Sequence, residues 1–192
     1  MPELSRNALV LRYLLEVAPS VGHTKLAKFA YLADLEARKY LARPISRFRY
    51  VRDQHGPFDA KAFFAARDEL VRKGYMTETP VECGPYVEYQ LQPTSRVPEY
   101  DFTVPEAEVL SYVARTYLSK TARDLCEEIV YQTPPMQNLK LGDEVPMDQM
   151  NGESRDKLGF NLERMLAGEA SAEAGRLRPM AEVVNELRAR YH

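Results

Sequence analysis

The sequence predicts a mainly helical α+β domain, compact and with one small β-hairpin. Apolar residues recur at steps of three and four in several stretches, which is the pattern of amphipathic helices. Two short runs of alternating apolar and polar residues flank a connection that contains Pro and Gly, which is typical of a hairpin. Of the 192 residues, 45% are hydrophobic and 28% are charged, the usual balance for a globular chain with a sizeable core.

The clearest helical pattern covers residues 23–41. We expect Thr24 to cap this helix, because its hydroxyl can accept an orphan amide of the first turn. Lys25 and Lys28 are three residues apart and share a face, with Tyr31 nearby. On periodicity alone, this is a core helix with solvated lysines. Its apolar stripe consists of Leu26, Phe29, Ala30, Ala33, Ala37, Tyr40 and Leu41.

Two further helices are expected on either side of it. The first, residues 5–17, ends before a break at Pro19 and Gly22. The other, residues 60–72, can be capped by Asp59. The side chains expected to point inward from it are Phe63, Phe64, Leu70 and Val71.

A hairpin should follow the third of these helices. Gly74 sits where a glycine commonly ends a helix. Residues 75–79 and 86–91 read as its strands, with Val87, Tyr89 and Leu91 alternating with polar neighbours. Two closely spaced helices, a third helix and this hairpin make the N-terminal half winged-helix-like, although any small helical bundle would fit the first two helices equally well.

The segment 43–57 mixes basic and aromatic residues and closes on a rigid Gly56-Pro57 turn. Its basic and aromatic residues are Arg43, Arg47, Phe48, Arg49, Tyr50 and Arg52. They suit an edge strand with solvated arginines, phosphate contacts to nucleic acid, or a surface for an acidic protein partner. The formal net charge of -2 favours a protein partner over nucleic acid.

The second half is expected to be helical. Residues 93–101 form a Pro- and Ser-containing link, the best candidate for a boundary between 1–92 and 102–192 within a single domain. A capping box at Thr103 and Glu106 begins the next helix, which should bury side chains as far as Leu118. Further helices are expected at 122–129, 154–166 and 179–191, the last packing on the body or docking on a partner. Cys126 reads as a small buried apolar residue.

Catalytic motifs are absent from the sequence. It contains no Gly-rich phosphate loop and no nucleophile elbow, and its histidines and two cysteines lack metal-ligand spacing. We therefore expect no enzyme, no cofactor and no metal. For His55 we favour a structural role as a hydrogen-bonded side chain. The weaker alternative is a hydrolase that uses His55 together with Asp53 or Asp59. We also expect a cytoplasmic protein without a membrane span, because no apolar run approaches the ~18 residues that a span requires.

A family resemblance adds a function. Residues 25–32, read as K-L-x-K-F-x-Y-L, resemble the helix of the SocA-like antitoxins, the Panacea domain. The similarity continues at Gly56-Pro57, at Gly74-Tyr75 and at Pro134-Pro135, so that it spans about residues 9–150. Two positions depart from the family: Val130-Tyr131 stands where Thr-His is frequent, and Met136 where an aromatic residue is frequent.

The resemblance implies a bacterial or phage antitoxin that neutralises a companion toxin by direct binding, and some relatives deliver the toxin to a protease. From the basic and aromatic residues, we expect the partner-binding surface near Lys25, Lys28, Tyr31, Arg47, Arg49 and His55. The runner-up hypothesis is a winged-helix DNA-binding transcriptional regulator.

Overall fold

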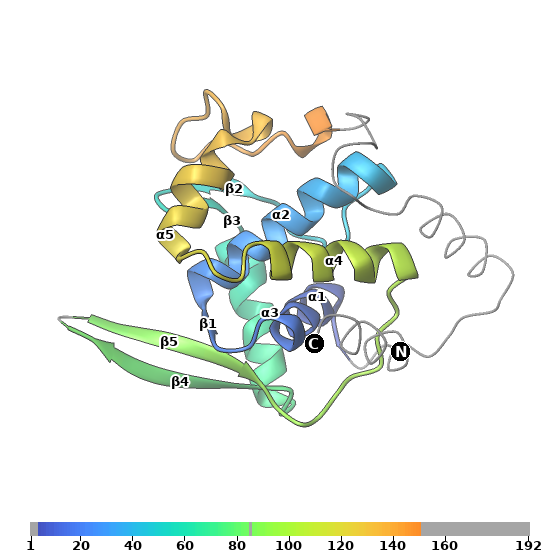
Figure 1. Ribbon diagram of the computed structural model, residues 1–192, viewed down its shortest axis with the longest axis vertical. Helices are drawn as coiled ribbons and strands as arrows, with labels where there is room; N and C mark the ends of the chain where they lie inside the picture. Colours follow the sequence, from blue (N-terminus) through green and yellow to red (C-terminus); the bar gives the residue numbers. More distant parts are fainter. Residues whose placement is uncertain (1–3, 85, 151–192) are drawn as a thin grey trace, which may run out of the picture.

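A computed structural model describes residues 4–84 and 86–150 of the chain (Figure 1). The helices expected at 154–166 and 179–191 lie outside the described residues. Within them, helices make up most of the regular structure and are joined by a small antiparallel sheet, so the protein is mixed α+β and mainly helical. No helix in this part of the chain is both long and apolar enough to cross a bilayer.

The first two helices are those expected. Helix α1 (Arg6–Val17) begins at Ser5, whose hydroxyl accepts the N–H of Ala8. Helix α2 (His23–Leu41) crosses the centre of the molecule and buries most of its length (Figure 1). Its N-cap is Gly22, which makes no side-chain bond, so the prediction that Thr24 caps this helix is wrong. The helix begins two residues earlier than a Thr24 cap requires.

Helix α3 (Ala60–Arg72) has the expected bounds, and Asp59 caps it by accepting the N–H of Ala62. Its buried residues are Phe63, Ala66 and Leu70. The expectation that Phe64 and Val71 point inward is wrong, because these side chains are 37% and 42% exposed. They are seven residues apart and share a second face, rotated about 100 degrees from that of Phe63 and Leu70.

The predicted hairpin is formed by β4 (Met76–Cys83) and β5 (Tyr86–Pro93), both longer than expected. Gly74 precedes it with a φ of +75°, a conformation that favours glycine. A two-residue strand, β1 (Val21–Gly22), pairs antiparallel with β5 and gives the sheet order β1-β5-β4. The far end of the hairpin projects away from the helices (Figure 1).

A second, two-stranded sheet was not predicted. Strands β2 (Val51–Asp53) and β3 (Gly56–Phe58) pair antiparallel around the predicted Gly-Pro turn. The outer edge of β2 is covered by the segment 142–145, since the N–H of Arg52 donates to the carbonyl of Asp143 at 2.8 Å. The edge-strand interpretation is therefore only partly right, because most of that edge is paired.

Helix α4 (Val104–Thr116) lies across α1 and α2, and the capping box of Thr103 and Glu106 is present as predicted (Figure 1). Glu106 is buried and accepts from both Arg6 and Arg43, at 2.7 and 2.6 Å. Leu118 was expected to be buried but is exposed, because α4 ends at Thr116.

A buried ion pair joins α1 to the link 93–101. Arg12 and Glu16, on successive turns of α1, are 2.7 Å apart and almost fully buried. The other end of the Arg12 guanidinium donates to the carbonyls of Thr94 and Arg96 at 3.0 and 2.9 Å. The Tyr100 hydroxyl donates to Glu16 at 2.9 Å. The link is thereby fixed along the first helix.

The remaining described chain is a series of short helical turns. Helix α5 (Ala122–Asp124) continues into a π-helical turn, η1 (Leu125–Ile129), which together match the helix expected at 122–129. Three 3-10 turns follow. They are η2 (Val130–Gln132), η3 (Pro134–Met136) and η4 (Met147–Met150).

Candidate functional site

The basic and aromatic segment is held in place by the carboxylate of Asp34, which is buried in the middle of α2. Asp34 accepts the N–H groups of Ile45 and Ser46, each at 2.8 Å, and the hydroxyl of Tyr50 at 2.7 Å. The hydroxyl of Ser46 also donates to it. Burial raises the pKa of Asp34, and these hydrogen bonds oppose the rise. The backbone of the segment is therefore fixed by a side chain of α2.

Lys28 lies beneath the Gly-Pro turn. Its side chain is buried, and its Nζ donates to the carbonyl of Pro57 at 2.8 Å. The expectation of a solvated lysine is therefore wrong at this position, because the β2–β3 turn folds over it. Gly56 has a φ of +90°, and a Cβ there would come within 3.4 Å of the Lys28 side chain. The turn can approach Lys28 closely because this residue is glycine.

The substitution Lys28→Met is expected to change how stability depends on pH. Burial lowers the pKa of Lys28 from 10.5 to about 8. Between these values the unfolded chain holds a proton that the folded protein has lost, so raising the pH stabilises the fold. Relative to Lys28→Met, the wild-type free energy of unfolding should rise by about 1 kcal/mol from pH 7 to 9. Urea unfolding at several pH values measures this, and a constant difference would contradict it.

Tyr31 is also internal. Its side chain is buried, and its hydroxyl is 2.8 Å from the hydroxyl of Thr133, just before η3. Its ring meets that of Tyr50 edge to face, with centroids 5.3 Å apart. Burial raises the pKa of Tyr31. Lys28 and Tyr31 therefore connect α2 to two distant segments, and neither is available at the surface in this structure.

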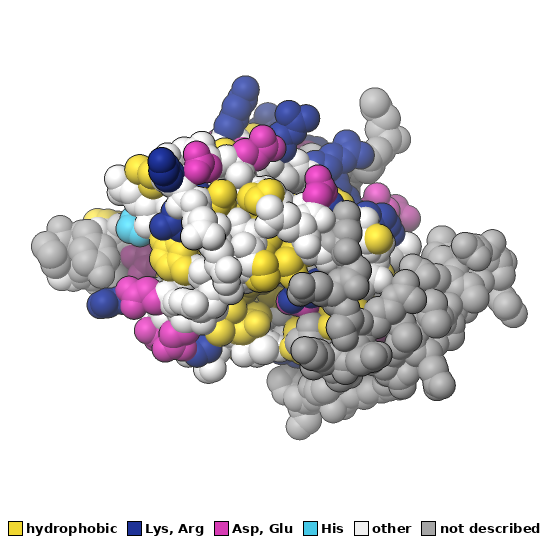
Figure 2. Space-filling view, turned by 90° about the horizontal axis from the view of Figure 1, so that it is seen from above, with side chains coloured by type: hydrophobic (Ala, Val, Ile, Leu, Met, Phe, Trp, Pro, Cys, Tyr) yellow, Lys and Arg dark blue, Asp and Glu magenta, His cyan; other side chains and the backbone are white. Residues whose placement is uncertain are grey.

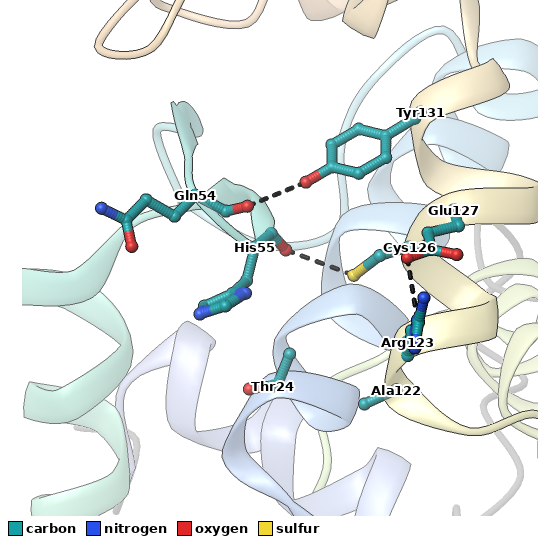
Figure 3. Close-up of a pocket in the computed structure, with 8 residues that line it drawn as sticks. All are labelled: Thr24, Gln54, His55, Ala122, Arg123, Cys126, Glu127 and Tyr131. Atoms are coloured by element: carbon teal, nitrogen blue, oxygen red, sulfur yellow. Dashed lines mark hydrogen bonds and ion pairs between the residues drawn. The ribbon is translucent and has the colours of Figure 1, made fainter.

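A pocket of about 440 Å³ opens beside the β2–β3 turn (Figure 3). It lies between this turn, the start of α2 and the helical turn α5–η1. The lining residues are Thr24, Gln54, His55, Ala122, Arg123, Cys126, Glu127 and Tyr131. The Cys126 thiol donates to the carbonyl of His55 at 3.2 Å, and the Tyr131 hydroxyl donates to the carbonyl of Gln54 at 3.0 Å. These two hydrogen bonds connect the helical turns η1 and η2 to the backbone of the β2–β3 turn, on the other side of the pocket.

The ionisable groups of the pocket are not arranged as a nucleophile and its base. The imidazole of His55 points away from the sulfur of Cys126, which faces the carbonyl oxygen of His55 (Figure 3). Burial raises the pKa of the Cys126 thiol, which favours the protonated form. Cys126 is buried as expected, although its thiol makes a polar contact.

The carboxylates considered as partners of His55 are used elsewhere. Both oxygens of Asp59 accept backbone N–H groups, from Ala62 and Arg49, and Asp53 accepts the N–H of Gln54. In the described part of the chain, no cluster of three or more His, Cys, Asp or Glu residues could hold a metal ion. The His55 hydrolase alternative therefore lacks an assembled acid–base pair among the described residues.

The other predicted site residues lie apart from one another. Lys25 donates through Nζ to the carbonyl of Leu118 at 2.5 Å. Arg47 and Arg49 are exposed on the segment before β2, and only their backbone N–H groups make hydrogen bonds among the described residues. Of the six predicted residues, His55 lines the pocket and the others do not. Whether these residues bind a partner stays a prediction.

The exposed aromatic surface lies elsewhere, between α3 and the β4–β5 hairpin. We define the α3–hairpin corner as His23, Phe64, Val87 and Tyr89. The His23 ring stacks on Tyr89, with centroids 6.0 Å apart, and meets Phe64 edge to face at 5.8 Å. Val87 and Tyr89 are 52% and 44% exposed. Burial lowers the pKa of His23, although the carboxylate of Glu78 opposes this.

Sequence reasoning missed this corner because its residues come from three separate segments. The alternation along 86–91 identified one strand face correctly. The alternation could not indicate how far along the strand the core extends. Leu91 is buried, whereas Tyr89 and Val87, on the same face, lie beyond the core and are exposed. Phe64 was assigned to the core because two adjacent phenylalanines can each fit a helical stripe.

Comparisons with protein-family models, with curated proteins and with solved structures give no match for this chain. The resemblance to the SocA-like antitoxins therefore rests on the motif residues alone. In the structure, the apolar members of the 25–32 motif are buried, while Lys28 and Tyr31 make the internal hydrogen bonds described above. Lys28 and Tyr31, two polar residues of the motif, therefore stabilise this fold by connecting α2 to other segments.

Proposed function

We propose that this protein is an antitoxin that neutralises a companion toxin by covering it through direct protein contact. The α3–hairpin corner is the observation that carries the proposal. Phe64, Val87 and Tyr89 are exposed although the rest of the fold has a well-buried core. Exposed aromatic residues that gather in one patch are typical of protein interfaces.

The arrangement of the pocket supports binding over catalysis. His55 and Cys126 meet through a backbone carbonyl, and Asp59 caps a helix. The 25–32 motif and the Gly56-Pro57 turn add the resemblance to the SocA-like antitoxins. Delivery of the toxin to a protease would be a second step that follows the same contact.

The substitution Tyr89→Asp is expected to weaken binding to the protein encoded by the adjacent open reading frame. A carboxylate in place of an exposed aromatic side chain should reduce affinity by about tenfold or more, since aromatic anchors dominate interfaces. Titration calorimetry with the purified partner and growth rescue in cells measure the effect. Leu141→Asp is the matched control, because Leu141 is also an exposed apolar residue but lies in the turn before Gly142.

Two results would contradict the proposal. One is rescue of growth by wild-type protein without any complex with the toxin. The other is equal loss of affinity in Tyr89→Asp and Leu141→Asp, which would place the contact outside the corner. Circular dichroism of each variant establishes that the fold is retained.

A winged-helix DNA-binding regulator is the second candidate, and the topology favours it. The order α1, β1, α2, α3, β4, β5, with β1 beside β5, is the arrangement that we infer to be winged-helix-like, although the separate β2–β3 sheet is inserted between α2 and α3. The charges oppose it, because β4 and β5 contain glutamates and no lysine or arginine. In the face seen in Figure 2, lysines and arginines of the described residues occur in separate groups among acidic and apolar side chains. Salt-sensitive retardation of duplex DNA would favour this candidate.

A further inference from the structure

The β4–β5 hairpin is acidic. Its strands contain Glu78, Glu82 and Glu88 and no lysine or arginine. Glu78 is engaged within the protein, 2.6 Å from Nε2 of His23 and 3.2 Å from the guanidinium of Arg67. Glu82 and Glu88 are exposed farther out along the hairpin. Glu82 is therefore the exposed carboxylate farthest from the helices among these three.

Strand register assigns these carboxylates to two faces. Glu78 pairs with Leu91, Pro80 with Tyr89 and Glu82 with Val87. Paired residues share a face of a sheet, so these side chains lie together on the inner face, which turns toward α3. Glu88 pairs with Val81 and belongs to the opposite face. The inner face thus combines two exposed apolar side chains with the carboxylate of Glu82.

The strand edges of the hairpin are only partly covered. Strand β5 is paired with β4 along its length, whereas β1 covers its other edge only at Gln90 and Leu91. The outer strand, β4, carries Pro80 near its middle, and proline has no N–H to donate. The exposed apolar side chains of the inner face are the surface that a partner would cover.

We propose that the α3–hairpin corner receives a basic, partly apolar segment of the companion toxin. This inference rests on the proposed antitoxin function. Apolar groups of such a segment would cover Val87 and Tyr89, while a lysine or arginine would pair with Glu82 or lie on the aromatic rings of Phe64 and Tyr89. Arg67 already stacks on Phe64, 4.9 Å from the ring centroid, so one face of this ring binds a guanidinium within the protein itself.

The substitution Glu82→Lys tests this charge complementarity. It should weaken binding of the adjacent gene's purified product by about tenfold or more, because a like charge would face the basic segment. Glu99→Lys changes the net charge equally at an exposed position of the link 93–101, outside the corner, and its effect should stay within about threefold. Surface plasmon resonance at two salt concentrations should show that the wild-type affinity, but not that of Glu82→Lys, falls steeply as salt rises.

A peptide array that tiles the same gene product provides a second readout. Wild-type protein should retain peptides with a net positive charge, and Glu82→Lys should lose them. If the complex forms but is insensitive to Glu82→Lys, or if the retained peptides are acidic or neutral, the inference is wrong and the antitoxin function stands. If wild-type protein forms no complex with the gene product, the proposed function is wrong, and this inference with it.

Discussion

The substitution Asp34→Ala is expected to lower the free energy of unfolding by about 3–5 kcal/mol, because it leaves buried donors without an acceptor. The N–H groups of Ile45 and Ser46 and the hydroxyl of Tyr50 would all lose their partner. Urea unfolding followed by circular dichroism measures the loss. Amide hydrogen exchange should also become faster at Ile45 and Ser46, since the carboxylate protects these groups directly.

Two variants serve as comparisons for Asp34→Ala. Tyr50→Phe removes one donor and leaves the others paired, so its cost should be about 1 kcal/mol. Asp68→Ala removes a carboxylate that is 67% exposed on α3, and its effect should stay within about 0.5 kcal/mol. If Asp34→Ala lowers the free energy of unfolding by less than Tyr50→Phe does, Asp34 does not hold the basic and aromatic segment in place.

The substitution Glu16→Ala should be similarly costly, at about 3–5 kcal/mol, because it leaves the buried charge of Arg12 without its carboxylate. Arg12 is 1% exposed, so water cannot replace the lost partner without opening the structure. Thermal and urea unfolding measure the loss. Limited proteolysis should detect faster cleavage in the link 93–101, which Arg12 and Glu16 hold along α1.

The double substitution of Arg12 and Glu16 by methionine separates charge from packing. It should be less destabilising than Glu16→Ala, since no charge is left buried. If the double variant is as unstable as Glu16→Ala, the stability lost in Glu16→Ala is due to packing and not to the unpaired charge. The division of the chain at 93–101 stays a prediction, and it gains support if Glu16→Ala produces two unfolding transitions instead of one.

The sequence was sufficient for elements specified by local patterns. The bounds of α1, α2 and α3 follow from apolar spacing and from chain breakers such as Pro19. Asp59 and the Thr103–Glu106 capping box could be identified because helix caps act within a few residues. The hairpin followed from alternation and its Pro-Gly connection.

The rest depends on contacts between distant residues. Strand β1 has only two residues, too few for a pattern, and exists because β5 lies beside it. The burial of Lys28 depends on Pro57, and that of Tyr31 on Thr133, which are 29 and 102 residues away. The α3–hairpin corner likewise depends on where the core ends. Periodicity indicates on which face of a helix or strand a residue lies, but not which other part of the chain covers that face.

The pairing of β2 with the segment 142–145 has a consequence during synthesis. The edge of β2 is closed by backbone bonds from residues that the ribosome adds roughly ninety positions later, including Arg52 to Asp143 and Val145 to Tyr50. A nascent chain that ends before Val145 thus displays an unpaired strand edge, a common site of intermolecular association. Translational pausing in this interval should therefore increase recruitment of chaperones, until the later segment emerges and seals the edge.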